Sequence, residues 1–292
     1  MSIYQNIVDR SPIDKGWSGD QKYCATTADG QKYLLRISSI DRLERKRREY
    51  EKMSEVGQLG IPMCMPVAFG TCDEGAYSIQ SWIDGADAES LVVAMGEREQ
   101  YRYGLDAGRI LAKIHTIPAP VDVPNWESRF NAKIDRKIAM YEACELKYES
   151  GGDAFLDYLA QNRHLLKDRP QSYQHGDYHI GNMMIDCDGV LNIIDFDRDD
   201  FGDPWEEFNR IVWCAQAAPA FASGMVDGYF DGERVIIRLK NSFHLKMLEN
   251  KNASDMLRAI VRNIEGVDGE VVFEVSNTKT EQESDLSMLF DE

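Results

Sequence analysis

The sequence predicts an α+β fold with two lobes, a small β-rich lobe over residues 1–84 and a mainly helical lobe over residues 85–231. Short segments in which apolar and polar residues alternate, separated by glycine-containing turns, fill the first range. Longer segments with apolar residues every three or four positions fill the second. Asp84 and Gly85 break the pattern between them, so the stretch Ser81–Gly85 is a candidate hinge. A chain of 292 residues is long enough for both lobes.

The first lobe is expected to contain one sheet and one helix. Its strands are expected at residues 22–26, 32–37, 67–70 and 76–83, with a hairpin turn at 28–30. The helix is expected at 38–56, where Ser39 or Asp41 can cap it. Gly16 and Gly19 lie in a turn before the first strand. Such a turn can bring backbone N–H groups close to phosphates, although a plain surface turn is the more common explanation.

The second lobe is expected to be built from amphipathic helices. They are expected at residues 97–115, 126–147 and 154–166, with a buried helix pair within 211–226. Residues 232–276 have the pattern of an appendage made of a strand, a helix and a strand, expected at 234–240, 243–264 and 271–275. Residues 277–292 are acidic and are expected to form a disordered tail.

The composition argues against several classes of partner. The formal charge of −17 makes a surface that repels phosphate backbones, so we expect no nucleic-acid partner. The same charge favours a cationic small-molecule ligand, although acidity also serves simply to keep a protein soluble. The six cysteines form no CxxC pair, which argues against zinc and disulfides and favours a cytoplasmic protein. Apolar runs fall short of the roughly 18 residues of a membrane span, so we expect no membrane partner.

The segment 173–197 carries the candidate active site. His175, Asp177 and Asn182 lie close together in sequence, and Asp195 and Asp197 follow after a predicted hairpin. This set suits phosphoryl transfer. That reaction requires a carboxylate to orient and deprotonate a hydroxyl, and oxygen ligands to hold Mg²⁺ on the nucleotide phosphates.

Each of these residues has an expected role. Asp177 is the candidate base, and Asn182 and Asp195 are candidate Mg²⁺ ligands. Asp197 joins them if the strand continues and places both carboxylates on one face. His175 is expected to brace the loop through hydrogen bonds. The alternative is a polar turn followed by two acids on an exposed strand edge. Against it, the two acids interrupt an apolar stretch, and burying a carboxylate requires nearby cations.

These motifs resemble those of the aminoglycoside phosphotransferase and choline kinase-like family over about residues 1–231. The segments that carry the resemblance are His175-Gly-Asp-Tyr-His-Ile-Gly-Asn182, Ile194-Asp-Phe-Asp197, Leu34-Leu-Arg-Ile37, Trp82-Ile-Asp-Gly85, Leu111-Ala-Lys-Ile-His115 and Gly202-Asp-Pro204. The resemblance implies a protein-kinase-like fold, Mg²⁺ as cofactor, and ATP or GTP as the phosphate donor. The acceptor is then a hydroxyl of a small molecule, with a cationic aminoglycoside-type antibiotic as the first candidate.

The resemblance also implies nucleotide-binding roles in the first lobe. Arg36 stands where many kinases carry the phosphate-binding lysine, and Glu49 on the predicted helix is its expected partner. The hinge backbone is expected to receive the nucleotide base, and the glycine turn to cover the phosphates. The residues concerned are Gln80, Trp82, Ile83, Gly16 and Gly19. Because an arginine forks differently from a lysine, the choice between ATP and GTP stays open.

The C-terminal residues depart from this family, whose members usually continue with further helices. Residues 234–275 are instead similar to the C-terminal domain of bacterial DNA polymerase III gamma/tau subunits, with Lys240-Asn-Ser-Phe-His244 at the strand-to-helix junction. The alternative function is therefore a catalytically impaired, kinase-like binding or assembly protein. In that case the C-terminal segment docks a protein partner.

Overall fold

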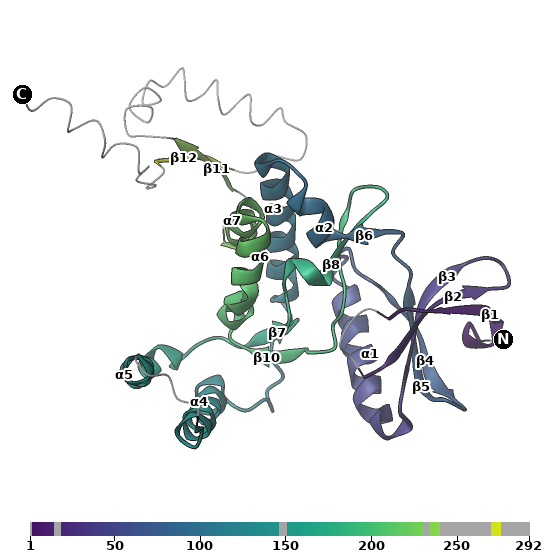
Figure 1. The fold of residues 1–292 in the computed structure, drawn as a ribbon, viewed down its shortest axis with the longest axis horizontal. Coiled ribbons are helices and arrows are strands. Elements are labelled where there is room, and N and C mark those ends of the chain that lie inside the picture. Colours follow the sequence, from purple (N-terminus) through teal and green to yellow (C-terminus); the bar gives the residue numbers. More distant parts are fainter. Residues whose placement is uncertain (1, 15–18, 146–150, 231–233, 240–269, 276–292) are drawn as a thin grey trace, which may run out of the picture.

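The structure, a computed structural model, describes residues 2–14, 19–145, 151–230, 234–239 and 270–275. Figure 1 shows a β-sheet with helix α1 on one side of the molecule and a group of helices that includes α3, α6 and α7 on the other. The α+β fold class predicted from the sequence is confirmed.

The first lobe is a sheet of five strands in the order β1-β2-β3-β5-β4, and all neighbours are antiparallel. The strands are β1 (Ile7–Pro12), β2 (Gln21–Thr27), β3 (Lys32–Ser38), β4 (Pro66–Cys72) and β5 (Gly75–Ser81). Four of them lie where the alternation predicts strands. Strand β1 is an additional edge strand that the alternation does not predict.

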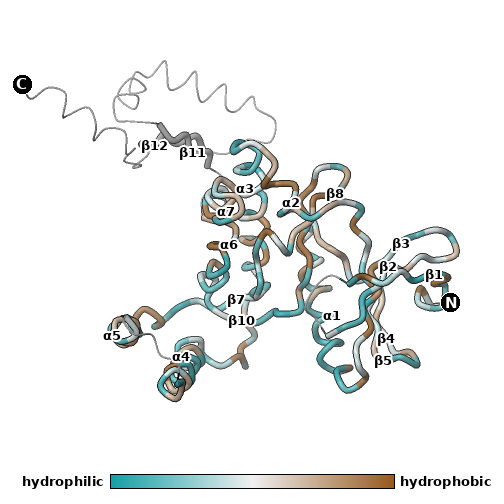
Figure 2. The backbone as a smooth tube through the Cα atoms, in the orientation of Figure 1, coloured by the Kyte–Doolittle hydropathy of each residue, from teal (hydrophilic) through white to brown (hydrophobic). Residues whose placement is uncertain are grey.

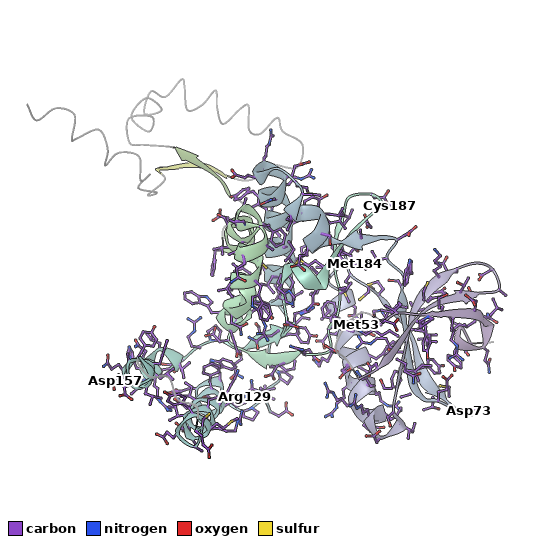
Figure 3. All side chains as sticks on the ribbon, viewed as in Figure 1. Met53, Asp73, Arg129, Asp157, Met184 and Cys187 are labelled. Atoms are coloured by element: carbon purple, nitrogen blue, oxygen red, sulfur yellow. The ribbon has the colours of Figure 1, made fainter. Side chains whose placement is uncertain are left out.

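Helix α1 (Leu43–Gly57) begins later than predicted, because Ile40–Arg42 form a 3-10 turn. Arg42 occupies the N-cap position, so neither Ser39 nor Asp41 caps the helix. Figure 2 shows α1 as mostly hydrophilic, in keeping with its alternating charges. Its buried residues, Met53 and Val56, nevertheless belong to the hydrophobic core of the second lobe. In Figure 3, Met53 lies where α1 faces that lobe. Helix α1 therefore packs its buried residues into the core of the second lobe, although it belongs to the first lobe by sequence.

Strand β3 places a cation between the lobes. Leu35 and Ile37 are buried in the core of the first lobe together with Ile79 of β5. Because successive side chains of a strand point to opposite faces, Arg36 points away from this core. It is 6% exposed and meets acidic side chains instead. The alternation of the strand thus directs Arg36 toward the candidate site.

The second lobe combines helices with two small sheets. Its helices are α2 (Ala88–Val93), α3 (Glu97–Ile114), α4 (Trp126–Glu142), α5 (Gly152–Asn162), α6 (Ile211–Ala217) and α7 (Pro219–Phe230). Its strands are β6 (Gly85–Asp87), β7 (Ser172–Gln174), β8 (Met183–Asp186), β9 (Leu191–Ile193) and β10 (Asp200–Gly202), ordered β6-β8-β9 and β10-β7. Short 3-10 turns lie at Arg163–Leu166, Ile180–Asn182 and Pro204–Arg210. Among the described helices, none is long and apolar enough to span a membrane.

The helix predictions hold with three corrections. The helix predicted at 154–166 is α5, which ends at Asn162 and is followed by the 3-10 turn Arg163–Leu166. Helix α4 ends at Glu142 rather than near residue 147, and residues 146–150 lie outside the described residues. The helix pair predicted within 211–226 is present as α6 and α7, but only α7 is mostly buried. Val212 and Trp213 on α6 are 54% and 45% exposed, so one face of α6 is open to solvent.

Helices α3 and α7 pack with their backbones in contact. Each helix carries two glycines four residues apart, and a Cβ added at any of the four would overlap a backbone atom of the other helix. They are Gly104 and Gly108 on α3, and Gly224 and Gly228 on α7. Residues four apart share one helix face, so the glycines form the contact. Helix α3 also holds the segment next to Asp177, because the hydroxyl of Tyr178 donates to the carbonyl of Ala107 at 2.7 Å.

The described part of the C-terminal segment is a pair of strands. Strands β11 (Arg234–Leu239) and β12 (Glu270–Val275) pair in parallel, with Arg234 opposite Glu270. Both strands lie where the sequence predicts them. A parallel pair requires a crossover connection, but the predicted helix at 243–264 and the predicted tail at 277–292 lie outside the described residues.

Candidate active site

The loop that follows β7 holds the candidate catalytic base. Gly176 has φ +81°, and a Cβ at this position would overlap the carbonyl oxygen of Arg198, so only glycine fits. The Gly176 N–H donates to Oε1 of Glu207 at 2.9 Å, and Glu207 is 3% exposed. The loop is therefore fixed from behind by a buried carboxylate immediately before Asp177.

His175 connects this loop to the segment that carries Asp195. It is fully buried, its Nε2 lies 3.0 Å from the carbonyl oxygen of Ile194, and its Nδ1 accepts the N–H of Asp177 at 3.3 Å. Since Nδ1 accepts and Nε2 faces an acceptor, the imidazole is assigned as neutral with its proton on Nε2. His175 thus braces Asp177 and makes no contact that would move a substrate proton.

Asp177 lies beside two arginines and a histidine. Its Oδ1 accepts from Nε of Arg210 at 3.0 Å, and its Oδ2 lies 3.4 Å from Nη1 of Arg198. Nε2 of His179 lies 3.8 Å from Oδ1. Burial lowers the pKa of His179, and the charge of Asp177 offsets this only in part. The side chain of Asp177 is 14% exposed, so its carboxylate remains accessible beside the arginines.

Asn182 and Asp195 lie on either side of the β8–β9 hairpin. The side-chain amide nitrogen of Asn182 donates to the Asp177 carbonyl at 2.9 Å, which turns its amide oxygen to other partners. Asp195 follows β9 with φ +66°, a left-handed conformation that ends the strand. The prediction that a continuing strand places Asp195 and Asp197 on one face is therefore wrong.

Asp195 and Asp197 instead converge on Arg36 from different directions. Nη1 of Arg36 donates to Asp195 at 3.1 Å and Nη2 donates to Asp197 at 3.3 Å. Burial lowers the pKa of Arg36, but the negative charges of Asp195, Asp20 and Asp197 raise it by more. The pKa of Arg36 therefore lies above its ordinary value. Arg36 is therefore a permanently charged centre between the lobes.

A cavity of about 260 Å³ between the lobes contains most of the predicted nucleotide-binding residues. They are Arg36, Gln80, Trp82 and Ile83, and the predicted metal ligands Asn182 and Asp195 line the same cavity. Ligand pockets typically start at roughly 300 Å³, so the size suits part of a nucleotide. Asp197 and Glu49 do not line this cavity but share a neighbouring hollow with Arg36. Gly19 lies beside Arg42, and Gly16 is outside the described residues.

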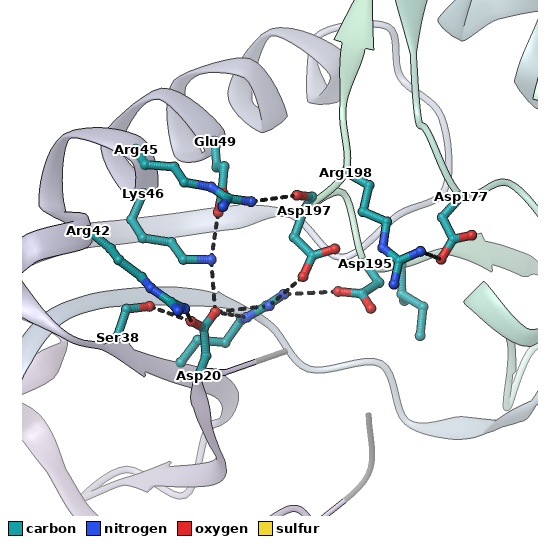
Figure 4. Close-up of polar contacts among 12 residues, drawn as sticks. Asp20, Ser38, Arg42, Arg45, Lys46, Glu49, Asp177, Asp195, Asp197 and Arg198 are labelled. Carbon is teal, nitrogen blue, oxygen red and sulfur yellow. Dashed lines mark hydrogen bonds and ion pairs between the residues drawn. The ribbon is translucent and has the colours of Figure 1, made fainter. Parts of the chain in front are cut away.

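The predicted pair of Arg36 with Glu49 is wrong. Glu49 binds Lys46 at 2.7 Å and Arg45 at 2.8 Å, both on its own helix. Arg36 binds Asp20 instead, with Nη2 at 3.0 Å and Nε at 3.2 Å from Oδ2. Figure 4 shows Asp20, Lys46 and Glu49 joined in one chain of contacts. The physical reason is that Lys46 lies three residues before Glu49 on the same face of α1, so the two side chains are neighbours. Glu49 therefore pairs with Lys46 and not with Arg36 on β3.

The donor set of this site fits a magnesium ion that also binds nucleotide phosphates. Among the described residues, no group of three or more His, Cys, Asp and Glu side chains forms a metal site. Mg²⁺ is usually held by one or two carboxylates together with substrate phosphates. The carboxylate of Asp195 and the amide oxygen of Asn182 line the same cavity and match that requirement. When bound, the ion would neutralise charge on the phosphates.

Several functional residues escape the sequence analysis. Asp20 directly follows the predicted glycine turn, and Lys46 lies on the helix predicted at 38–56. Arg198 and Arg210 are separated from Asp177 by 21 and 33 positions, so only the folded chain reveals them. The signal that was available is the Gly202-Asp-Pro204 motif, which leads directly into the turn that ends at Arg210.

The fold and this arrangement define a two-lobed, kinase-like phosphotransferase. The chain matches the model of the phosphotransferase enzyme family over residues 9–237 and belongs to that family. Among curated proteins, none matches the sequence.

Solved structures show the same fold at low sequence identity. An aminoglycoside-3'-phosphotransferase of type VIII is 16% identical, with a TM-score of 0.53 over 77% of this chain and 86% of the other. A macrolide 2'-phosphotransferase from Brachybacterium faecium is 15% identical, with a TM-score of 0.54 over 76% and 77%. The ADP-bound aminoglycoside phosphotransferase APH(2'')-Ib is 17% identical, with a TM-score of 0.57 over 90% of both chains.

Proposed function

We propose that this protein transfers the γ-phosphoryl group of a nucleotide, in the presence of Mg²⁺, to a hydroxyl of a small molecule. The observation that carries the proposal is the contact between Asn182 and the Asp177 backbone. It joins the candidate base to a cavity that also contains Arg36 and Asp195. A phosphate donor, a metal and an acceptor hydroxyl can therefore meet within one site.

The first lobe supplies the nucleotide site of the proposal. The hinge residues Gln80–Ile83 line the cavity beside the apolar side chains of Leu34, Met184 and Ile194, which suits a planar base. Arg36 supplies a fixed positive charge for the phosphates. Asn182 and Asp195 would hold Mg²⁺. Asp197 contacts Arg36 in the neighbouring hollow, which supports a role beside Arg36 rather than at the metal.

The second lobe supplies the base. Asp177 accepts the proton of the acceptor hydroxyl as the oxygen attacks the phosphorus atom, and a positioned base contributes about 10²–10⁴-fold in rate. Arg210 and Arg198 hold the carboxylate in orientation before the reaction. His175 fixes the loop, so the base meets the substrate with little reorganisation.

Two observations bear on the charge of the acceptor, and they point in opposite directions. The net charge of −17 favours a cationic acceptor, and the structural relatives include enzymes named for aminoglycosides and a macrolide. Close to Asp177, however, the described cationic side chains are Arg198 and Arg210. An aminoglycoside-type antibiotic is therefore the first candidate, and neutral or anionic alcohols complete the panel. All six cysteines are free, which suits a cytoplasmic location.

The experiment is a binding and turnover assay with matched variants. Thermal unfolding is measured with Mg-ATP and Mg-GTP. Turnover is then measured across aminoglycosides, macrolides, amino alcohols, and neutral and anionic alcohols. Asp177→Ala should abolish turnover while nucleotide binding persists. A protein that binds neither nucleotide would contradict the proposal. That result would favour the alternative function, an assembly protein whose C-terminal segment docks a partner. Removal of residues 234–292 tests this alternative, because it should abolish binding of the partner.

A further inference from the structure

The carboxylate that makes the most contacts with Arg36 is Asp20, which lies immediately before β2, and not a glutamate of helix α1. In protein kinases the phosphate-binding lysine pairs with a glutamate of the corresponding helix. Here the glutamate of α1, Glu49, is occupied by Lys46 and Arg45. Asp20 accepts from both Nε and Nη2 of Arg36, at 3.2 and 3.0 Å. The fork of the guanidinium is thus fixed by one carboxylate oxygen.

Asp20 is built into this position. Its side chain is 1% exposed, and Nζ of Lys46 lies 2.9 Å from Oδ2 while the Ser38 hydroxyl donates to Oδ1 at 2.7 Å. Burial raises the pKa of Asp20, but the hydrogen bonds from Lys46 and Ser38 and the charge of Arg36 outweigh it, so the pKa lies below its ordinary value. Asp20 follows Gly19 directly and precedes β2.

The other two carboxylates on Arg36 are less suited than Asp20 to hold it throughout the reaction. Asp195 engages Nη1 of Arg36 and is also a proposed Mg²⁺ ligand, so its oxygens are required elsewhere when the nucleotide is bound. Asp197 makes the longest contact of the three, at 3.3 Å. Asp20 occupies Nε and Nη2 and leaves Nη1, which faces the cavity with Asp195, as the donor for a phosphate.

We propose that Asp20 is the positioning residue for Arg36, in the place of the helix glutamate of protein kinases, and thereby sets the affinity for nucleotide phosphates. Glu49 positions Lys46 and Arg45 instead. This inference rests on the proposed function, because it takes Arg36 as the residue that binds phosphates.

The test compares binding of a nucleoside and of its Mg-diphosphate by calorimetry, using adenosine and Mg-ADP or guanosine and Mg-GDP according to what the wild type binds. Asp20→Asn keeps the shape and removes the charge. It should weaken diphosphate binding about tenfold or more while nucleoside binding changes less than about twofold. Asp20→Glu should recover part of the loss. Glu49→Gln should weaken diphosphate binding by no more than about threefold. In turnover, Asp20→Asn should raise KM for the nucleotide and leave KM for the acceptor unchanged.

Three results overturn the inference. They are equal losses for Asp20→Asn and Glu49→Gln, a larger loss for Glu49→Gln, and an equal loss of nucleoside and diphosphate binding in Asp20→Asn. If Asp20→Asn does not fold, Ser38→Ala carries the test. It removes one hydrogen bond from Asp20 and should weaken diphosphate binding about two- to fivefold, with nucleoside binding preserved; no change would overturn the inference. A wild type that binds no nucleotide defeats the proposed function itself, which separates the two failures.

Discussion

Nε of Arg210 donates to Oδ1 of Asp177 at 3.0 Å, and Cζ of the same guanidinium lies 4.8 Å from the ring centroid of Trp213. Arg210 ends the 3-10 turn Pro204–Arg210, and Trp213 lies on the exposed face of α6. The indole therefore limits the movement of the arginine that holds the candidate base. In this way the acceptor side of the site depends on a segment far from the loop that carries Asp177.

Arg210→Gln should lower kcat and leave nucleotide binding unchanged. Without the guanidinium, Asp177 loses its closest partner and the orientation of its carboxylate relaxes. A misplacement of about 1 Å can cost on the order of 10²-fold in rate, so we expect a loss of about 10- to 100-fold. Steady-state kinetics with a saturating acceptor measures it, and calorimetry with the nucleotide checks that the first lobe is intact.

Arg198→Gln is the matched comparison for that prediction. Arg198 makes a longer contact with Asp177, 3.4 Å, and its side chain is 55% exposed. Exposed ion pairs contribute little, so the loss in kcat should be smaller than for Arg210→Gln. A larger loss at Arg198 would mean that this arginine acts on the phosphoryl group and not only on the base.

The candidate catalytic segment could be predicted because its residues lie close together in sequence. His175, Asp177 and Asn182 fall within one loop, and the strand period of β3 directs Arg36 away from the core. These features depend on local spacing alone. The same local rule predicts four of the five strands of the first sheet, each with alternating apolar residues.

The partner of Arg36 could not be predicted from spacing. Helix α1 carries several acids and bases in succession, and which of them reach Arg36 depends on how the helix docks on the sheet. Asp195 shows a second limit of prediction from sequence. Its φ of +66° ends the strand, so its side chain does not point where the alternation of a continuing strand predicts. Long-range pairing and isolated left-handed residues arise from the tertiary structure, and a pattern of residue types does not encode them.

Gly108→Ala should destabilise the second lobe. A Cβ at Gly108 would overlap the backbone of Met225 on α7, and backbone atoms cannot rotate away as a side chain can. Overpacking of this kind costs about 1–3 kcal/mol, measured as the change in free energy of unfolding in urea. Gly96→Ala is the control, since its Cβ would meet nothing within 4 Å and its φ of −69° suits alanine. Equal effects of the two substitutions would refute the close approach of α3 and α7.

Asp199→Asn should stabilise the protein, and the gain should depend on pH. Burial, followed by the charges of Glu49 and Asp200, raises the pKa of Asp199 to about 6 from an ordinary value of 3.8. The folded state therefore binds this proton more tightly than the unfolded state. The charged carboxylate costs stability above pH 6, and the cost disappears below about pH 4, where both states are protonated.

The gain from Asp199→Asn is expected to be on the order of 1–3 kcal/mol at pH 7.5, measured by urea unfolding between pH 4 and 8. Asp73→Asn, in the exposed turn between β4 and β5, serves as the control for losing one negative charge. If the stability difference between Asp199→Asn and the wild type were the same at pH 4.5 and pH 7.5, Asp199 would not have the raised pKa.

Asp195→Asn should remove the magnesium-dependent part of nucleotide binding. Asp195 lines the cavity with Asn182, whereas Asp197 faces the hollow shared with Glu49, so the two carboxylates should differ. A ligand at 100 times its Kd stabilises the native state by about 2.7 kcal/mol, and thermal unfolding with nucleotide, with and without Mg²⁺, reports that increment. Asp195→Asn should abolish the difference between the two conditions, and Asp197→Asn should retain it. The reverse order would assign the metal to Asp197 and require the loop after β9 to rearrange when the nucleotide binds.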